Sequence, residues 1–187
     1  MNRVALLGVI GLAFSGFANI SNYSVLVGKW SGRVEKNARD VTHGGNPSEG
    51  EVGTPVIIKF TKTKDGLEGE SRLGKNIETW QIINNQYIWS DELIEVVAEA
   101  VHFEKIPSWI KSELELKPTD QIFAFKFKKC VLKKEKKTCT PKKDYPEGLD
   151  DSGHWIFEAQ ANQLLSHVLY EYADGKKRIL TESLKKE

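Results

Sequence analysis

The residues that could do chemistry are few and scattered. Four histidines, at positions 43, 102, 154 and 167, lack the paired spacing of a zinc-binding helix or ribbon. Residues 150–154 read Asp-Asp-Ser-Gly-His and contain the three residue types of a serine-hydrolase triad. Neighbours in the chain cannot generally point at one another as a nucleophile, base and acid must, and no Gly-x-Ser-x-Gly elbow is present. We therefore expect no catalytic residue, metal or cofactor, and a protein that is not an enzyme.

Two of the histidines, His154 and His167, belong to the same predicted hairpin. Counting outward from a turn at residues 161–162 makes them diagonal neighbours on one face of the sheet. Either could serve as a metal or haem ligand, but the simpler interpretation is that both are ordinary hydrogen-bonded histidines of a sheet.

Aromatic side chains are more informative than the titratable ones. In the strand that begins at residues 119–120, three phenylalanines alternate with alanine and lysine, so they share one face. Inside a barrel, such side chains either fill the core or line an apolar pocket with a few polar anchors. We predict a small apolar or amphipathic ligand held inside the barrel by Phe123, Phe125, Phe127, Trp155, Phe157 and Tyr170.

Lysines gather in one segment of a chain whose formal net charge is only +1. Residues 126–143 hold nine lysines, opposed by Glu135 alone. The simplest interpretation is a solvated hairpin whose lysines prevent edge-to-edge pairing. The alternative is contact with an acidic protein or anionic surface, which would make the chain a protein-interaction module with a filled core. Nucleic acid is not an expected partner of an exported protein.

The two cysteines, Cys130 and Cys139, occur within that basic segment. In an exported protein an even pair predicts a disulfide, and the eight residues between them match no common zinc spacing. Closing a loop of about ten residues would stabilise the fold by roughly 2–3 kcal/mol.

The first eighteen residues differ from the rest of the chain. A short basic start is followed by an apolar run over 4–14 and by small residues at Gly16 and Ala18, which predicts a secretory signal peptide, residues 1–18. The apolar run is too short to span a bilayer, which needs about twenty residues. We expect an exported protein, periplasmic or secreted, with residues 19–187 forming one monomeric domain.

The remaining pattern predicts short antiparallel strands joined by tight turns. Strands are expected over 25–35, 55–63, 67–73, 76–83 and 86–90, with turns at 65–66 and 84–85. Residues 154–186 predict three more, joined by turns at 161–162 and 174–175. Residues 93–104 suit a strand better than a helix because β-branched residues are dense, and residues 107–114 suit a short helix. We expect an all-β, up-and-down barrel of about eight to ten strands.

The Gly28-Lys29-Trp30 triplet at the start of the first strand resembles the Gly-x-Trp signature of lipocalins and related calycin barrels. The resemblance implies that Trp30 plugs the closed end of a calycin-like barrel beneath an arginine of the last strand, for which Arg178 is the candidate. It also keeps a haem ligand at His167 open as a minor alternative. A second lipocalin signature, built around Thr-Asp-Tyr, is absent from a suitable place.

Overall fold

Antiparallel strands account for most of the protein. The computed structural model describes residues 20–39, 52–90, 92–138, 153–171 and 175–187. Their strands are β1 (Gly28–Arg39), β2 (Pro55–Lys62), β3 (Gly66–Leu73), β4 (Asn76–Ile83), β5 (Gln86–Ser90), β6 (Ile94–Val101), β7 (Gln121–Leu132), β8 (Lys137–Thr138), β9 (His154–Gln160), β10 (Gln163–Glu171) and β11 (Lys177–Lys186). The helical segments are η1 (Ile20–Leu26), η3 (Phe103–Lys105) and α1 (Ser108–Glu113).

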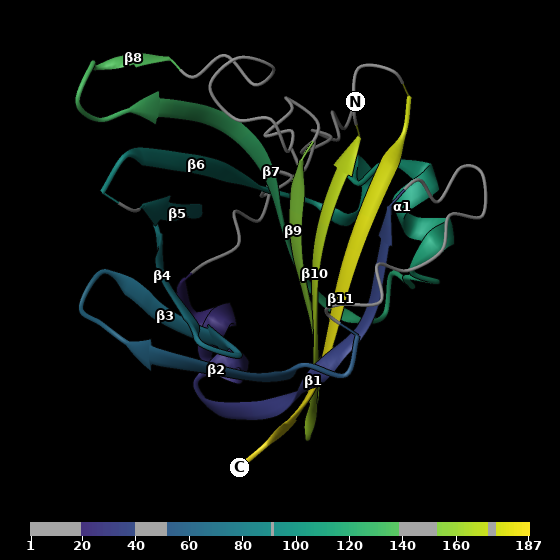
Figure 1. Ribbon diagram of the computed structural model, residues 1–187. Helices are drawn as coiled ribbons and strands as arrows, with labels where there is room; N and C mark the ends of the chain where they lie inside the picture. The colour runs from purple at the N-terminus through teal and green to yellow at the C-terminus, as the bar shows by residue number, and fades with distance from the viewer. Residues whose placement is uncertain (1–19, 40–51, 91, 139–152, 172–174) are drawn as a thin grey trace, which may run out of the picture.

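The sheet closes on itself. It runs in the order β6-β5-β4-β3-β2-β1-β11-β10-β9-β7-β8, and β6 also pairs with β7, so every strand except β8 belongs to a closed ring (Figure 1). Each strand of the ring pairs antiparallel with its neighbours. The expected all-β, calycin-like up-and-down barrel with one short helix is confirmed.

The hairpin turns at 84–85 and 161–162 lie where the sequence places them. Asn84 and Asn85 both have positive φ, 51° and 61°, as a two-residue turn of this kind requires. Residues 161–162 join β9 to β10, and the register pairs His154 with Leu169 and His167 with Ile156. The two histidines are therefore diagonal neighbours on one face, as the turn position predicts.

The uncertain middle of the chain forms a strand and then a short helix. β6 occupies most of the region for which a strand was preferred, and η3 follows it. The pairing of β6 with β7 contains an irregularity between Val97 and Ala98. Helix α1 falls within the predicted helical segment 107–114.

The segment that carries η3 and α1 covers the outside of the barrel. Ile106, Ile110 and Leu116 pack with Ala124, Ile156, Leu169 and Ile179 in one core cluster. Figure 1 shows α1 beside the outer side of the sheet near β11 and β1. Strands β9, β10 and β11 are consequently buried on both faces, so a polar residue on either face can be removed from water.

Trp30 lies near one end of the barrel, under a cation. Its indole Nε1 donates a hydrogen bond to the backbone oxygen of Leu26 at 2.8 Å, and its side chain is fully buried. The Nζ atom of Lys186 lies 5.1 Å from the centroid of the Trp30 ring. Trp30 is therefore a buried aromatic residue with a lysine above its ring, and its role as a plug stays a prediction.

The predicted partner of Trp30, Arg178, is at the other end of the strand. The register places Trp30 opposite Lys186 and Arg39 opposite Arg178. Because β1 and β11 are antiparallel, the start of one meets the end of the other. This corrects the barrel-closure pair from Trp30–Arg178 to Trp30–Lys186, while the expected meeting of the first and last strands is confirmed.

Several predictions concern residues outside the described ranges: the leader over 1–18, Asp150, Asp151 and Ser152 of the triad-like run, Asp174 of the turn at 174–175, and Cys139. Cys130 is buried and is not a free thiol, and its pairing with Cys139 stays a prediction. Within the described ranges, the structure contains no helix long and apolar enough to cross a membrane.

Candidate functional site

The barrel interior is sealed at the end where η1 lies. Tyr23 and Leu26 of η1 are 3% and 0% exposed, and Tyr23 OH lies 3.5 Å from Oδ1 of Asn85 in the β4–β5 turn. Leu164 on β10 and Leu184 on β11 face the interior at the same end and are fully buried. We call this the closed end.

At the opposite end, several inward-facing side chains are only half-buried. Trp155 on β9 and Leu180 on β11 pack against the interior core but keep part of their surface exposed. Val168, paired with both of them, is half-buried as well. Glu78 on β4 lies two residues from the buried Trp80, on the same face of the strand, and is exposed. We call this the accessible end.

Aromatic rings fill the layer between the two ends. The ring centroid of Tyr87 on β5 lies 5.0 Å from that of Trp155 on β9 and 5.8 Å from that of Phe125 on β7. The rings of Phe60 on β2 and Phe157 on β9 meet edge-on at 5.5 Å. These strands are not neighbours in the sheet, so the rings touch across the barrel. We call this layer the aromatic floor of the accessible end.

All six predicted ligand-binding residues lie on β7, β9 and β10, but they divide between the two ends. Phe123 and Phe125 contact the Tyr23 ring at 5.2 and 6.2 Å, so they help to seal the closed end. Trp155 lies 6.3 Å from Phe127, and Tyr170 packs on the same cluster. The accessible end therefore keeps Phe127, Trp155 and Tyr170, with Phe157 in the floor beneath them, and the binding role of all six stays a prediction.

The sequence analysis missed a buried carboxyl group on the inner face. Glu182 on β11 is 8% exposed and lies opposite Val34 on β1 and Ser166 on β10. Burial raises the pKa of the Glu182 carboxyl to about 7; a hydrogen bond from Ser166 acts against this rise, and Glu78 adds to it. The sequence could have indicated its inward position, because Glu182 lies two residues from both Leu180 and Leu184. Residues two apart in a strand share a face, and both leucines face inward.

The same charges act on the tyrosine in the floor. Tyr87 is 4% exposed, and burial raises the pKa of its phenol well above the ordinary value. Glu78, Tyr170 and Glu182 raise it further, in that order. These groups come from four different strands, so the interior contains a polar cluster directly beside the aromatic floor.

His154 and His167 face away from this interior. His167 is 3% exposed, and its Nδ1 lies 3.0 Å from Oγ1 of Thr181. Burial, aided by the charge of Lys36, lowers the pKa of His167 to about 4. His154 shares the outer face and is also buried. Among the residues that the structure describes, no group of three or more histidines, cysteines and acids could hold a metal ion.

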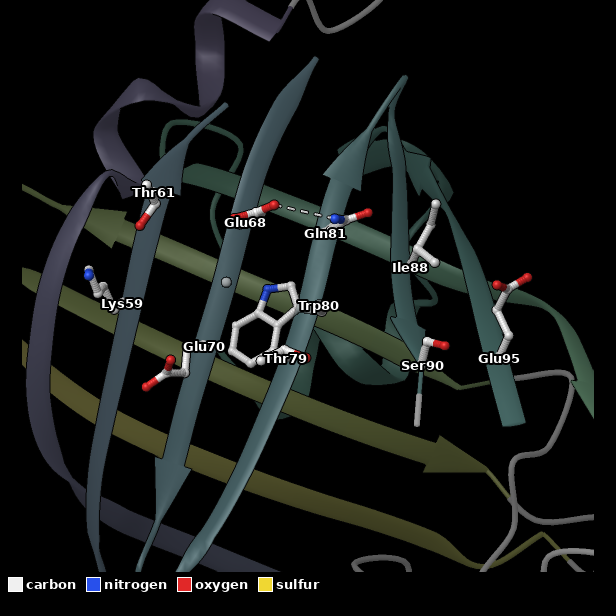
Figure 2. Close-up of a pocket in the computed structure, with 11 residues that line it drawn as sticks. Lys59, Thr61, Glu68, Glu70, Thr79, Trp80, Gln81, Ile88, Ser90 and Glu95 are labelled. Carbon is white, nitrogen blue, oxygen red and sulfur yellow. Dashed lines mark hydrogen bonds between the residues drawn. The ribbon is translucent and has the colours of Figure 1, made fainter. Parts of the chain in front are cut away.

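A groove lies on the outside of the barrel. This groove, of about 620 Å³, crosses β2 to β6 and is lined mainly by outward side chains, among them Lys59, Glu68, Glu70, Ile88 and Glu95 (Figure 2). Gln81 Nε2 lies 3.5 Å from Oε1 of Glu68 within it. Its walls are mostly polar or charged, in contrast to the aromatic interior.

Comparison with known proteins identifies no relative by sequence. No family model matches this chain. No curated protein matches it either.

Two solved structures have a similar course of the chain. One is the zebrafish ileal bile acid-binding protein complexed with cholic acid, 12% identical, with a TM-score of 0.47 over 88% of this chain and 100% of the other. The second is secretory abundant heat soluble protein 4 from Ramazzottius varieornatus, 8% identical, with a TM-score of 0.43 over 86% and 94% of the two chains. At these scores neither ligand nor role is transferred from them.

Proposed function

We propose that the protein is a non-catalytic carrier or binding protein that holds a small apolar or amphipathic molecule in the accessible end of the barrel. The observation that carries this proposal is the contrast between the two ends. The closed end buries Tyr23, Leu26, Leu164 and Leu184, whereas Trp155, Tyr170 and Leu180 at the other end are half-buried. An aromatic surface kept partly exposed inside a concave wall is the kind of surface that apolar ligands cover.

The interior suits such a ligand better than the outer groove does. A small-molecule site is predominantly apolar with a few placed polar groups. The interior offers Trp155, Tyr170 and Phe127 with the Glu182–Ser166 pair. The outer groove is lined by three glutamates and one lysine, of which Lys59, Glu68 and Glu70 are exposed to water.

A pair of filling variants tests which surface binds. We expect Val168→Trp to weaken binding of the uncharged dye Nile red by about tenfold or more, because the indole occupies the space beside Trp155 and Leu180. The matched control, Ile88→Trp, places the same bulk in the outer groove and should leave the affinity unchanged. Dye fluorescence in a titration measures both, and thermal unfolding checks that each variant is folded.

The opposite pattern, with Ile88→Trp weakening the dye and Val168→Trp not, would place the site outside the barrel. Failure of the wild-type protein to bind the dye at all would contradict the proposal. The alternative function is then contact with an acidic partner through the hairpin of β7 and β8, where Lys133, Lys134 and Lys136 are exposed. Its mark is binding to an acidic polymer that high salt abolishes.

Export is part of the proposal and is supported by the leader-like sequence of residues 1–18. It predicts that Cys130 and Cys139 are joined, because an oxidising compartment favours the disulfide. Thiol titration of the purified, denatured protein should then detect no reactive cysteine without reductant and two after reduction. Two reactive thiols in the unreduced protein would contradict both the pairing and the compartment.

A further inference from the structure

We propose that the ligand carries a basic amine, which pairs with the Glu182 carboxylate while its apolar part covers the aromatic floor. This inference rests on the proposed function, since it names the chemical class of ligand for the same site. A preference for amines would distinguish this barrel from one that accepts any apolar molecule.

The position of Glu182 is the first argument. Its carboxyl lies on the inner face in a row with Val34 and Ser166, and the whole residue is 8% exposed. A buried carboxylate is costly unless a cation or several hydrogen bonds compensate for the water it loses. The Ser166 hydroxyl supplies one hydrogen bond. The negative charge of the ionised Glu182 carboxylate still needs a positive group beside it.

The surrounding charges are the second argument. Glu78 from β4, Tyr87 from β5 and Tyr170 from β10 act within the same polar cluster. Arg178 shares the inner face of β11 but lies four residues before Glu182. The neighbouring charge that acts on the Glu182 carboxyl is that of Glu78, which raises its pKa. Lys186 is at the closed end, over Trp30. The site beside Glu182 therefore favours a positive group and disfavours a negative one.

The aromatic rings are the third argument. Tyr87 and Trp155 lie almost parallel, 5.0 Å apart, beside the polar cluster. The faces of such rings attract ammonium groups, and they cover alkyl chains equally well. An alkylamine can satisfy the carboxylate and the rings together. An alcohol of the same length satisfies only the rings, and an alkyl carboxylate is repelled by both Glu182 and Glu78.

Three ligands with the same eight-carbon chain, octylamine, octanol and octanoate, test the inference by competition with Nile red near pH 8, where Glu182 is ionised. We expect octylamine to bind the wild-type protein about tenfold or more tightly than octanol, and octanoate to bind most weakly. In Glu182→Gln, octylamine and octanol should bind with similar affinity, because the carboxylate that distinguishes them is gone. The amine preference of the wild type should also fall as the pH is lowered through about 7.

The matched control is Glu158→Gln. Glu158 on β9 is likewise 8% exposed, but its side chain lies on the outer face, where Gln160 contacts it at 3.3 Å. This variant should keep the full preference for the amine. Equal binding of octylamine and octanol to the wild type, or a preference that survives Glu182→Gln, overturns the amine inference and leaves the proposed function standing. If none of the three displaces the dye and the dye itself does not bind, it is the proposed function that fails.

Discussion

Replacing Gly32 by alanine is expected to destabilise the barrel by more than about 3 kcal/mol. A Cβ atom at this position would lie 1.8 Å from the backbone oxygen of Ser183 and 2.8 Å from Cα of Leu184. Both contacts are with the backbone of β11, which cannot rotate away as a flexible side chain could. The two strands would have to separate at the point where the ring closes.

Strand β1 has no freedom to yield in the other direction. Gly32 pairs with Leu184 on one side and with Val56 on the other, so a shift away from β11 compresses or breaks the pairing with β2. Chemical denaturation followed by tryptophan fluorescence measures the loss. Arg33→Ala, an exposed position on the same strand, is the control and should change stability by less than about 0.5 kcal/mol. A Gly32→Ala variant as stable as this control would show that the seam tolerates a methyl group.

Local signals explain why so much of the fold could be predicted. The asparagines at 84 and 85 allow the positive φ values of a tight turn, and three alternating phenylalanines fix which face of β7 points inward. Each of these patterns is complete within a few residues. Antiparallel hairpins then pair neighbours in the chain, and closure follows because the last strand needs a partner.

The candidate site depends on contacts that no short stretch of sequence contains. Thr181 and Glu182 are adjacent in the chain and both buried, although they face opposite sides of β11. This happens because η3 and α1 cover the outer face of the sheet, a packing that strand alternation cannot reveal. The pairing of Trp30 with Lys186 likewise depends on the register of the first and last strands of the chain.

The burial of Glu182 leads to the second large effect, which concerns how stability depends on pH. We expect Glu182→Gln to remove the loss of stability on the alkaline side of the pH profile. The pKa of Glu182 is raised from 4.5 to about 7 in the folded protein, so the folded state holds this proton more tightly than the unfolded state. The contribution of the Glu182 carboxyl to the free energy of unfolding is therefore fully present below about pH 4.5 and is lost as the pH rises through about 7. Near pH 8 the variant should be more stable than the wild type by up to about 3 kcal/mol, and near pH 4 by almost nothing.

His167, on the other face of β10, should produce the opposite dependence. Burial and Lys36 lower the pKa of His167 from 6.5 to about 4, so the folded state resists protonation. Its contribution is fully present above about pH 6.5 and is lost as the pH falls toward 4. His167→Gln, which can still hydrogen-bond with Thr181, should flatten the acid side of the profile and leave the alkaline side unchanged. Urea denaturation at a series of pH values measures both sides. A His167→Gln variant that flattened the alkaline side would contradict the lowered pKa of His167.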